Sequence, residues 1–400
     1  MDRDGNRDLD IGVDRDSNRD LDIGVDRDSK IYVAGHTGLV GSAVVRALKR
    51  RGYANLLTAT HGELDLTDAA ATRAWFEREK PDAVILAAAK VGGIGANAAD
   101  NVGFLRENLA IALSVIEAAR AVGVTKLINL GSSCIYPRDA AQPIVEEALL
   151  SGPLEPTNEG YALAKIAALK LCELSNRQYG TNFLSLMPTN LYGPGDTYDL
   201  DDSHVLPALI KRFDDAKTAD QSSVTLWGDG SPLREFLYVD DLAGAVVFAL
   251  EQVDTAHSLR FGAAEAADSD GSVDGNAPRA DAATREPSWI NVGSGEEVSI
   301  AALAALARAV VYADSDAPLP TIEWDTTRPN GMPRKLLDSA RINALGWYAT
   351  TPLRDGIERT YAAYQEAMRN TDSTQTSAAS RESAHHEGTE HAAAASREER

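Results

Sequence analysis

The chain has 400 residues, of which 44% are hydrophobic and 25% are charged, and its formal net charge is −21. These values predict a globular protein with one large or two moderate domains, and the acidic excess argues against a nucleic-acid-binding surface. No apolar run is long enough for a membrane span, no signal-peptide pattern opens the chain, and two cysteines exclude a disulfide framework, so we expect a cytoplasmic protein without a membrane partner or a metal site.

The chain opens on a twelve-residue repeat. DRDGNRDLDIGV at 2–13 recurs as DRDSNRDLDIGV at 14–25. Two copies cannot bury a continuous apolar face, because stacked repeats generally need at least three, so we predict that residues 1–29 are a disordered leader.

Residues 30–190 alternate short runs of Val, Ile and Leu with helical patterns. In chain order, we predict a strand at 30–35, a helix at 40–51, a strand at 55–60, a helix at 68–79, a strand at 82–89, a helix at 104–122, a strand at 126–132, a helix at 161–179 and a strand at 183–187. Such alternation predicts a doubly wound parallel sheet covered by helices on both faces, an α/β Rossmann domain.

The rest of the chain predicts a second domain and two irregular segments. Residues 235–250 and part of 289–300 are expected to return to the Rossmann domain, while 191–234 and 296–365 form a smaller α/β substrate-binding domain. Residues 253–287 predict a long acidic loop, and 370–400, which contain no Phe, Trp or Tyr, a disordered tail. The acidic excess has two interpretations, acidic appendages or a halophilic surface for a high-salt cytoplasm, and the scarcity of lysine favours the second.

A glycine motif directly follows the first predicted strand. Its three glycines are Gly35, Gly38 and Gly41, and the predicted helix begins within it. Glycines at these places allow a tight turn, bring backbone close to a pyrophosphate and let helix and strand pack closely. The motif therefore predicts a dinucleotide site at the helix N-terminus, lined also by His36, Thr37, Leu39 and Val40.

The second and third strands contribute to the same cofactor site. An acid after the second strand would indicate NAD and a basic residue NADP. Here the only nearby basic residue is His61, a candidate for a 2′-phosphate, and Asp65 and Leu66 are candidates for the adenine edge. Ala87 and Ala88 end the third strand and are small enough for the cofactor to lie against the sheet. The residues favour neither cofactor decisively.

Three side chains predict proton-transfer chemistry. Tyr161 and Lys165 are four residues apart on one face of a predicted helix, where the ammonium group favours the phenolate and so lowers the tyrosine pKa. Ser132 and its neighbour Ser133 follow a strand and lie at the carboxyl edge of the sheet. Together with a nicotinamide, they can exchange a proton with a carbonyl or an alcohol.

With these motifs in view, the chain resembles the extended short-chain dehydrogenase/reductase superfamily. Within it, the chain is similar to the 3,5-epimerase–4-reductases that convert GDP-4-keto-6-deoxy-D-mannose to GDP-L-fucose. The segments that carry the resemblance, between about Lys30 and Tyr364, include GHTGLVGSA at 35–43, AAAKVGGIGAN at 87–97, LGSSCIYP at 130–137, MPTNLYGPGD at 187–196, SHVLPALIKRF at 203–213, WGDGSPLREFLYVDDLA at 227–243 and PNGMPRKLLD at 329–338.

The resemblance implies roles for individual residues. It makes Cys134 and His204 the acid–base pair that epimerises carbons 3 and 5. It makes Tyr161 the proton donor for reduction of the 4-ketone, with Ser132 as the catalytic serine and Lys165 on the nicotinamide ribose. Reference pKa values of about 8.5 for cysteine and 6.5 for histidine suit acid–base work near neutrality.

The resemblance also implies binding residues. Those near the cofactor and the sugar are Pro188, Thr189, Asn190, Leu191 and His204. Arg212 and Arg234 suit the diphosphate of a GDP-sugar, Trp227 its nucleotide, and Asn330 stands where the family has an acid.

The chain departs from the family at three cofactor positions. Thr37, Ala59 and His61 stand where the family has arginines, so NADP is implied but NAD stays open. Two other functions also stay open. One is a sister reductase or epimerase for another nucleotide 4-keto-sugar, and the other is a catalytically idle dinucleotide sensor. The resemblance also implies a homodimer, in which helices near 99–122 and 160–179 pair across a two-fold axis.

Overall fold

The computed structural model describes residues 25–200, 203–255, 288–328 and 331–370. The predicted leader up to residue 24, most of the predicted 253–287 loop, the tail from 371 and Asn330 lie outside these ranges. Residues 25–29, which the sequence analysis assigned to the leader, belong to the folded domain. Val25 packs against the core and Arg27 forms an ion pair with Glu251 at 2.5 Å, so the domain begins earlier than predicted.

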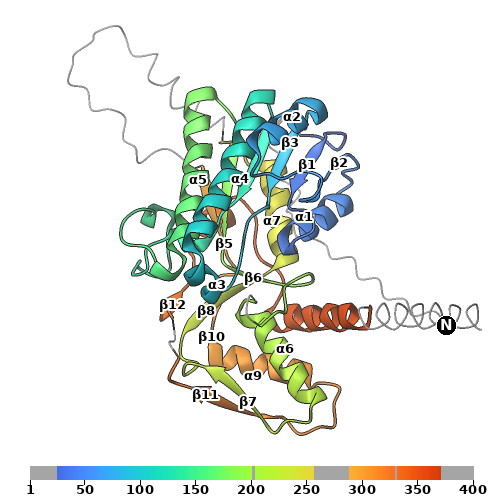
Figure 1. The fold of residues 1–400 in the computed structure, drawn as a ribbon, viewed down its shortest axis with the longest axis vertical. Helices are drawn as coiled ribbons and strands as arrows, with labels where there is room; N and C mark the ends of the chain where they lie inside the picture. The colour runs from blue at the N-terminus through green and yellow to red at the C-terminus, as the bar shows by residue number, and fades with distance from the viewer. Residues whose placement is uncertain (1–24, 201–202, 256–287, 329–330, 371–400) are drawn as a thin grey trace, which may run out of the picture.

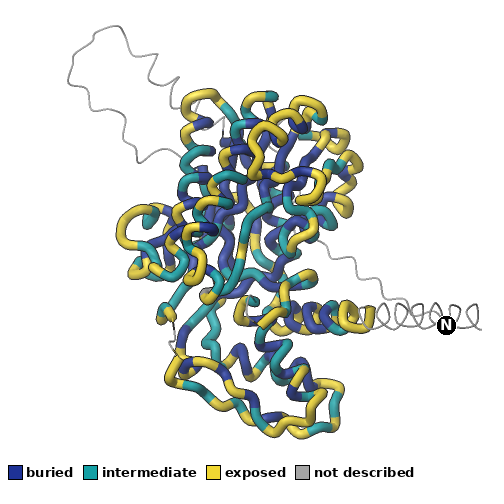
Figure 2. Tube along the Cα trace, in the orientation of Figure 1, coloured by how far each residue is buried: buried dark blue, intermediate teal, exposed yellow. Residues whose placement is uncertain are grey.

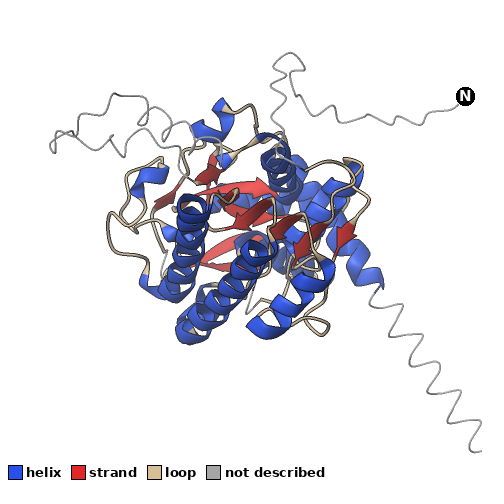
Figure 3. Ribbon diagram, turned by 90° about the horizontal axis from the view of Figure 1, so that it is seen from above, coloured by secondary structure: helices blue, strands red, loops and turns tan. Residues whose placement is uncertain are grey.

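A six-stranded parallel sheet forms the centre of the larger domain (Figures 1 and 3). Its order is β2-β1-β3-β4-β5-β9, which confirms the predicted doubly wound α/β class. The strands are β1 (Ile31–Ala34), β2 (Leu56–Leu57), β3 (Ala83–Leu86), β4 (Lys126–Leu130), β5 (Phe183–Pro188) and β9 (Trp289–Val292). All neighbouring pairs in this sheet are parallel.

Helices cover both faces of this sheet, as Figure 3 shows. One face packs on α1 (Leu39–Arg50) and α7 (Val239–Gln252), and the other on α2 (Ala69–Glu79), α4 (Asn101–Val122) and α5 (Glu159–Tyr179). Successive strand residues point to opposite faces, so Ile31 and Val33 enter the first core and Tyr32 and Ala34 the second. Both layers are buried, which explains why the strands are mostly apolar (Figure 2).

The smaller domain contains two further sheets. In one, β6 (Asn190–Tyr192), β10 (Glu297–Ser299) and β12 (Arg334–Lys335) all pair with β8 (Leu233–Tyr238). In the other, β7 (Ser223–Trp227) pairs in parallel with β11 (Thr321–Asp325). Helices α6 (Val205–Thr218) and α9 (Ile300–Val311) and the helical residues 353–370 pack on a separate core. The short α10 (Ala340–Ala344) follows β12 in the chain.

The structure differs from the predicted elements in four places. The second strand shortens to two residues, and the glycine-rich segment after β3 contains the unpredicted helix α3 (Ile94–Ala99). Helix α4 begins three residues earlier than predicted because the carboxylate of Asp100 accepts a hydrogen bond from the Gly103 N–H. Residues 235–238, expected to return to the Rossmann domain, pair in the smaller sheet as part of β8, while Leu237 packs in the core of the larger domain.

Short 3-10 helices complete the fold at η1 (Ser133–Ile135), η2 (Glu146–Ala148) and η3 (Pro156–Asn158). Among the described helices, none combines the length and the apolar character that crossing a membrane requires.

Candidate active site

The glycine motif lies where the order of the central sheet reverses. β1 has β2 on one side and β3 on the other, so the carboxyl ends of β1 and β3 border a crevice, the usual ligand site of such sheets. Gly35 has φ +80°, and a Cβ there would lie 2.7 Å from the backbone nitrogen of Ala88. A Cβ at Gly41 would lie 2.0 Å from the Gly35 carbonyl oxygen. A side chain at either position would clash with backbone atoms. Only glycine therefore lets α1 pack directly against the loop.

The N-terminus of α1 suits an anion. Gly38 caps the helix without a side-chain hydrogen bond, and the first turn contains no acidic residue. The N–H groups of that turn and the helix dipole therefore favour a phosphate. The Nδ1 atom of His36, in the same loop, is buried and has no hydrogen-bond partner in the described part of the chain. These residues fit the pyrophosphate of a dinucleotide cofactor.

The loop after β2 presents His61 to solvent. Its side chain is 84% exposed, and its Nδ1 lies 4.0 Å from Asp65 Oδ1. That carboxylate oxygen also accepts hydrogen bonds from the backbone N–H and the hydroxyl of Thr67, which hold the Asp65 side chain in its own turn. Leu66 is buried against the sheet. His61 is therefore the residue in this loop that is accessible to an adenosine phosphate.

Ser132, Tyr161 and Lys165 meet at the carboxyl end of β4. The Ser132 side chain accepts a hydrogen bond from the Cys134 N–H at 3.2 Å and is also hydrogen-bonded to Tyr161. Lys165 donates to the Leu130 carbonyl at 2.8 Å and lies 5.7 Å from the centre of the Tyr161 ring. The turn after β4 and helix α5 therefore bring the three side chains together.

The pKa values of this group differ from the sequence expectation. Burial, followed by the nearby charge of Cys134, raises the pKa of Tyr161, whereas the sequence predicted that Lys165 would lower it. Lys165 lies over the face of the ring and bonds to a carbonyl, and burial lowers its own pKa to about 8. Tyr161 is therefore protonated at neutral pH, the form needed by a proton donor.

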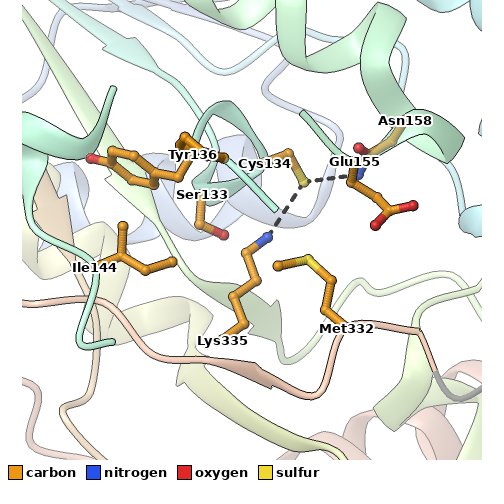
Figure 4. Close-up of a pocket in the computed structure, with 9 residues that line it drawn as sticks. Ser133, Cys134, Tyr136, Ile144, Glu155, Asn158, Met332 and Lys335 are labelled. Atoms are coloured by element: carbon orange, nitrogen blue, oxygen red, sulfur yellow. Dashed lines mark hydrogen bonds between the residues drawn. The ribbon is translucent and has the colours of Figure 1, made fainter. Parts of the chain in front are cut away.

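Cys134 lies in η1, two residues after Ser132, and borders a small cavity of ≈ 20 Å³ (Figure 4). Two nitrogens point to its sulfur: Asn158 Nδ2 at 3.2 Å and Lys335 Nζ at 3.7 Å. Lys335 thus places a cation beside the sulfur that the resemblance implies as an acid–base group. Sequence reasoning missed both partners, although Lys335 lies within the segment 329–338 that it had singled out.

His204 lies on the smaller domain, as the N-cap of α6, with no capping bond from its side chain. The surrounding protein lowers its pKa, although the residue still reaches solvent. In the described part of the chain, it makes no hydrogen bond with Cys134 or Tyr161. The acid–base role of His204 therefore stays a prediction.

The segment from Pro188 to Leu191 links the two domains. Pro188 ends β5, and Leu191 lies in β6, which pairs with β8. The Thr189 hydroxyl and Asn190 Nδ2 both donate to the carbonyl oxygen of Glu235, at 3.3 and 2.7 Å. Their side chains thus hold β8 in place, in addition to any contact with a cofactor or sugar.

The predicted diphosphate residues lack acidic partners. Among the described residues, neither Arg212 nor Arg234 forms an ion pair, although the chain is strongly acidic. Arg234 donates to the Leu233 carbonyl at 2.8 Å, and burial lowers its pKa. Trp227 is 62% exposed at the end of β7, and the guanidinium of Arg328 lies 4.9 Å from its ring centre. No group of metal-ligating side chains occurs within the described ranges.

Comparison with known proteins agrees with this geometry. Residues 31–261 match the NAD dependent epimerase/dehydratase family. The GDP-L-fucose synthase 1 of Arabidopsis thaliana is 48% identical over 86% of this chain and 95% of its own length. The GDP-L-fucose synthase of Escherichia coli strain K12 is 44% identical over 84% and 97%. A solved GDP-mannoheptose C4 reductase from Campylobacter jejuni with NADP bound superposes with a TM-score of 0.72, at 33% identity over 86% of this chain and all of that one.

The fold and the site therefore define an NAD dependent epimerase/dehydratase. Within that class, identities of 44–48% over most of the sequence place the chain in the GDP-L-fucose synthase family.

Proposed function

We propose that this chain converts GDP-4-keto-6-deoxy-D-mannose to GDP-L-fucose, as a 3,5-epimerase and NADPH-dependent 4-reductase. The observation that carries the proposal is the turn after β4, which presents Ser132 to Tyr161 and, two residues later, Cys134 to Asn158 and Lys335. One turn thus serves two kinds of chemistry, a carbonyl reduction and a proton exchange at carbon.

Epimerisation comes first in this proposal. The 4-ketone of the substrate acidifies the protons on carbons 3 and 5. Cys134 in its thiolate form removes a proton from one face, and His204 returns one to the opposite face, so the configuration inverts. Asn158 and Lys335 hold the sulfur in position, and the Lys335 ammonium group lies beside it.

Reduction follows at carbon 4. NADPH, when bound, supplies the hydride. Tyr161 donates the proton to the ketone oxygen, and Ser132 orients that oxygen by hydrogen bonding. The raised pKa of Tyr161 keeps the phenol protonated until transfer. Lys165, whose pKa is about 8, is positively charged at neutral pH and suits the nicotinamide ribose.

The cofactor in this proposal is NADP(H). The first two strands and α1 hold its pyrophosphate and adenosine through Gly35, Gly38 and Gly41. His61 is the exposed basic side chain available to the 2′-phosphate, since Thr37 and Ala59 replace the arginines implied by the family. NADP in the C. jejuni reductase structure supports this choice.

The smaller domain is the substrate domain. Arg234 and Arg212 have no acidic partners among the described residues, and a guanidinium offers paired donors to a diphosphate. The exposed ring of Trp227 suits stacking against the guanine base. Asn330 lies outside the described residues and stays a sequence-based candidate for the nucleoside.

We also propose a homodimer in a high-salt cytoplasm. Apolar side chains are exposed on α4 and α5, and the net charge of −21 supports a well-hydrated surface in salt.

An assay of the purified chain with NADPH and GDP-4-keto-6-deoxy-D-mannose tests the proposal. The product is identified by NMR. GDP-L-fucose is the expected product. If NADPH were oxidised but the configuration at carbons 3 and 5 did not change, the chain would instead be a 4-reductase, like the C. jejuni relative.

A further inference from the structure

Glu235 is a buried carboxylate next to the substrate arginine on β8. The residue is 0% exposed, and it forms no ion pair with a cation among the described residues. Its oxygens instead accept backbone hydrogen bonds, from the Gly295 N–H at 2.8 Å and the Leu337 N–H at 3.1 Å. Burial raises its pKa, and the bonds from Leu337 and Gly295 oppose that rise. The Thr189 hydroxyl and the Ser294 N–H add to these bonds, but no cation balances the buried carboxylate among the described residues, so its burial costs free energy.

One of these bonds, from the Leu337 N–H, reaches the segment that carries Lys335. Leu337 is two residues beyond Lys335, and Lys335 itself stands opposite Arg234 in the pairing of β12 with β8. Ile144 donates to the Leu336 carbonyl at 2.8 Å, which fixes the other side of the segment. β12 has only two residues, and the Arg334–Glu297 ion pair at 2.7 Å and the bond from the Leu336 N–H to Gln142 Oε1 at 2.8 Å also hold it, so its position depends on all of these contacts.

The contact that this segment makes is with the sulfur of Cys134. Lys335 Nζ lies 3.7 Å from Cys134 Sγ across the cavity in Figure 4. The two residues come from different domains and are far apart in the sequence. Their distance is therefore set by the elements that join β8, β12 and the turn after β4.

We propose that Glu235 is a positioning residue that holds Lys335 against Cys134 and thereby sustains the reactivity of the sulfur used for epimerisation. The inference deepens the proposed function and rests on it for the role of the thiolate. Glu235 itself touches neither sulfur nor substrate, and acts through the backbone of Leu337.

The test measures the reactivity of Cys134 without any substrate. Iodoacetamide alkylates thiolates, and Cys172 is fully buried, so alkylation of the intact protein reports on Cys134. The variants are Glu235→Gln, whose amide cannot accept from both N–H groups, and Lys335→Met, which removes the ammonium group. Glu323→Gln, an exposed glutamate on β11 of the same domain, is the matched control.

We expect alkylation at neutral pH to slow by about fivefold in Lys335→Met, because the sulfur loses its neighbouring cation, and by a similar factor in Glu235→Gln. The double variant should be no slower than either single variant, because both changes remove one interaction. The control should react like the parent chain. Deuterium exchange at carbons 3 and 5 should fall in parallel, with NADPH affinity unchanged.

Three results would overturn the proposal. The first two are an unchanged alkylation rate in folded Glu235→Gln and an unchanged rate in Lys335→Met. The third is a double variant whose alkylation rate falls by the product of the two single reductions. Glu235→Asp, which keeps the charge on a shorter side chain, covers a failure of Glu235→Gln to fold. If neither folds, Glu235 serves the stability of the fold and not the position of Lys335. Because alkylation needs no substrate, these results stand apart from a failure of the GDP-sugar assay.

Discussion

Burial moves the two key titrating groups of α5 in opposite directions. It raises the pKa of the Tyr161 phenol and lowers that of the Lys165 ammonium to about 8. Each shift disfavours the charged form, as expected for groups removed from water. A protonated phenol is what a ketone reduction requires, so this environment favours reduction over alcohol oxidation at neutral pH.

Asp196, in the loop after β6, gives a test of the same physics in stability. Its Oδ2 is buried and has no hydrogen-bond partner among the described residues, and burial raises its pKa from 3.8 to about 7. The folded chain thus holds this proton more tightly than the unfolded chain. The stabilisation is complete below the unfolded value and is lost as the pH rises through the folded value.

Asp196→Asn should therefore stabilise the ligand-free chain at alkaline pH. We expect a gain of about 1–2 kcal/mol, discounted from the full shift because the residue is partly exposed to solvent. The gain should vanish near the unfolded pKa of 3.8. Denaturant unfolding at both pH values checks this, with the exposed Asp316→Asn as control. An equal gain at both pH values would contradict the assignment.

At the scale of elements, the sequence predicted most of the central sheet because its signals are local. The strands of the larger domain are mostly apolar runs, and the glycines from Gly35 to Gly41 mark one turn. Tyr161 and Lys165 were found because they lie one helical turn apart. The partners of Cys134 were missed because Lys335 lies 201 residues away on a two-residue strand, and no local pattern encodes that contact.

The close approach of α1 to its loop predicts the effect of one methyl group. Gly41→Ala would place a Cβ 2.0 Å from the Gly35 carbonyl oxygen, so α1 must move away from the phosphate loop. We expect a loss of about 1–3 kcal/mol in stability and weaker NADPH binding. Gly244→Ala in α7 is the matched control, because its Cβ would meet only Trp347 Nε1 at 3.7 Å.

The two variants separate packing from helix propensity. Both exchange a helical glycine for alanine, a change that by itself favours the helix by about 1 kcal/mol. Unfolding curves measure the change in stability, and NADPH titration measures the change in cofactor binding. If Gly41→Ala behaved like Gly244→Ala in both, the proposed contact between α1 and the glycine loop would be wrong.

At the scale of the whole molecule, one surface is unusually apolar for so acidic a chain. Helices α4 and α5 pack side by side (Figures 1 and 3) and expose leucines at helical spacing. Leu109 and Leu113 on α4 are 40% and 52% exposed, and Leu163 and Leu174 on α5 are 41% and 51% exposed. Such a face fits a second copy of the chain, which would form a four-helix interface.

Leu113→Glu should therefore shift the chain from dimer to monomer. A charge buried on each side of a two-fold interface weakens it by at least about tenfold in Kd. Sedimentation at working salt checks the mass against 42.7 kDa for one chain. Leu319→Glu, also 52% exposed but on the smaller domain, is the control. A parent chain that sediments as a monomer would contradict the proposed homodimer.

Epimerisation at Cys134 and reduction with Tyr161 are separable steps, although both depend on the turn after β4. Deuterium uptake by Tyr161→Phe distinguishes them. In D2O with GDP-4-keto-6-deoxy-D-mannose and NADPH, the variant should still incorporate deuterium at carbons 3 and 5, while NADPH oxidation falls by about a hundredfold or more. Cys134→Ser, the matched variant in the same turn, should lose the exchange. Loss of exchange in folded Tyr161→Phe, or its retention in Cys134→Ser, would contradict the division of labour between these residues.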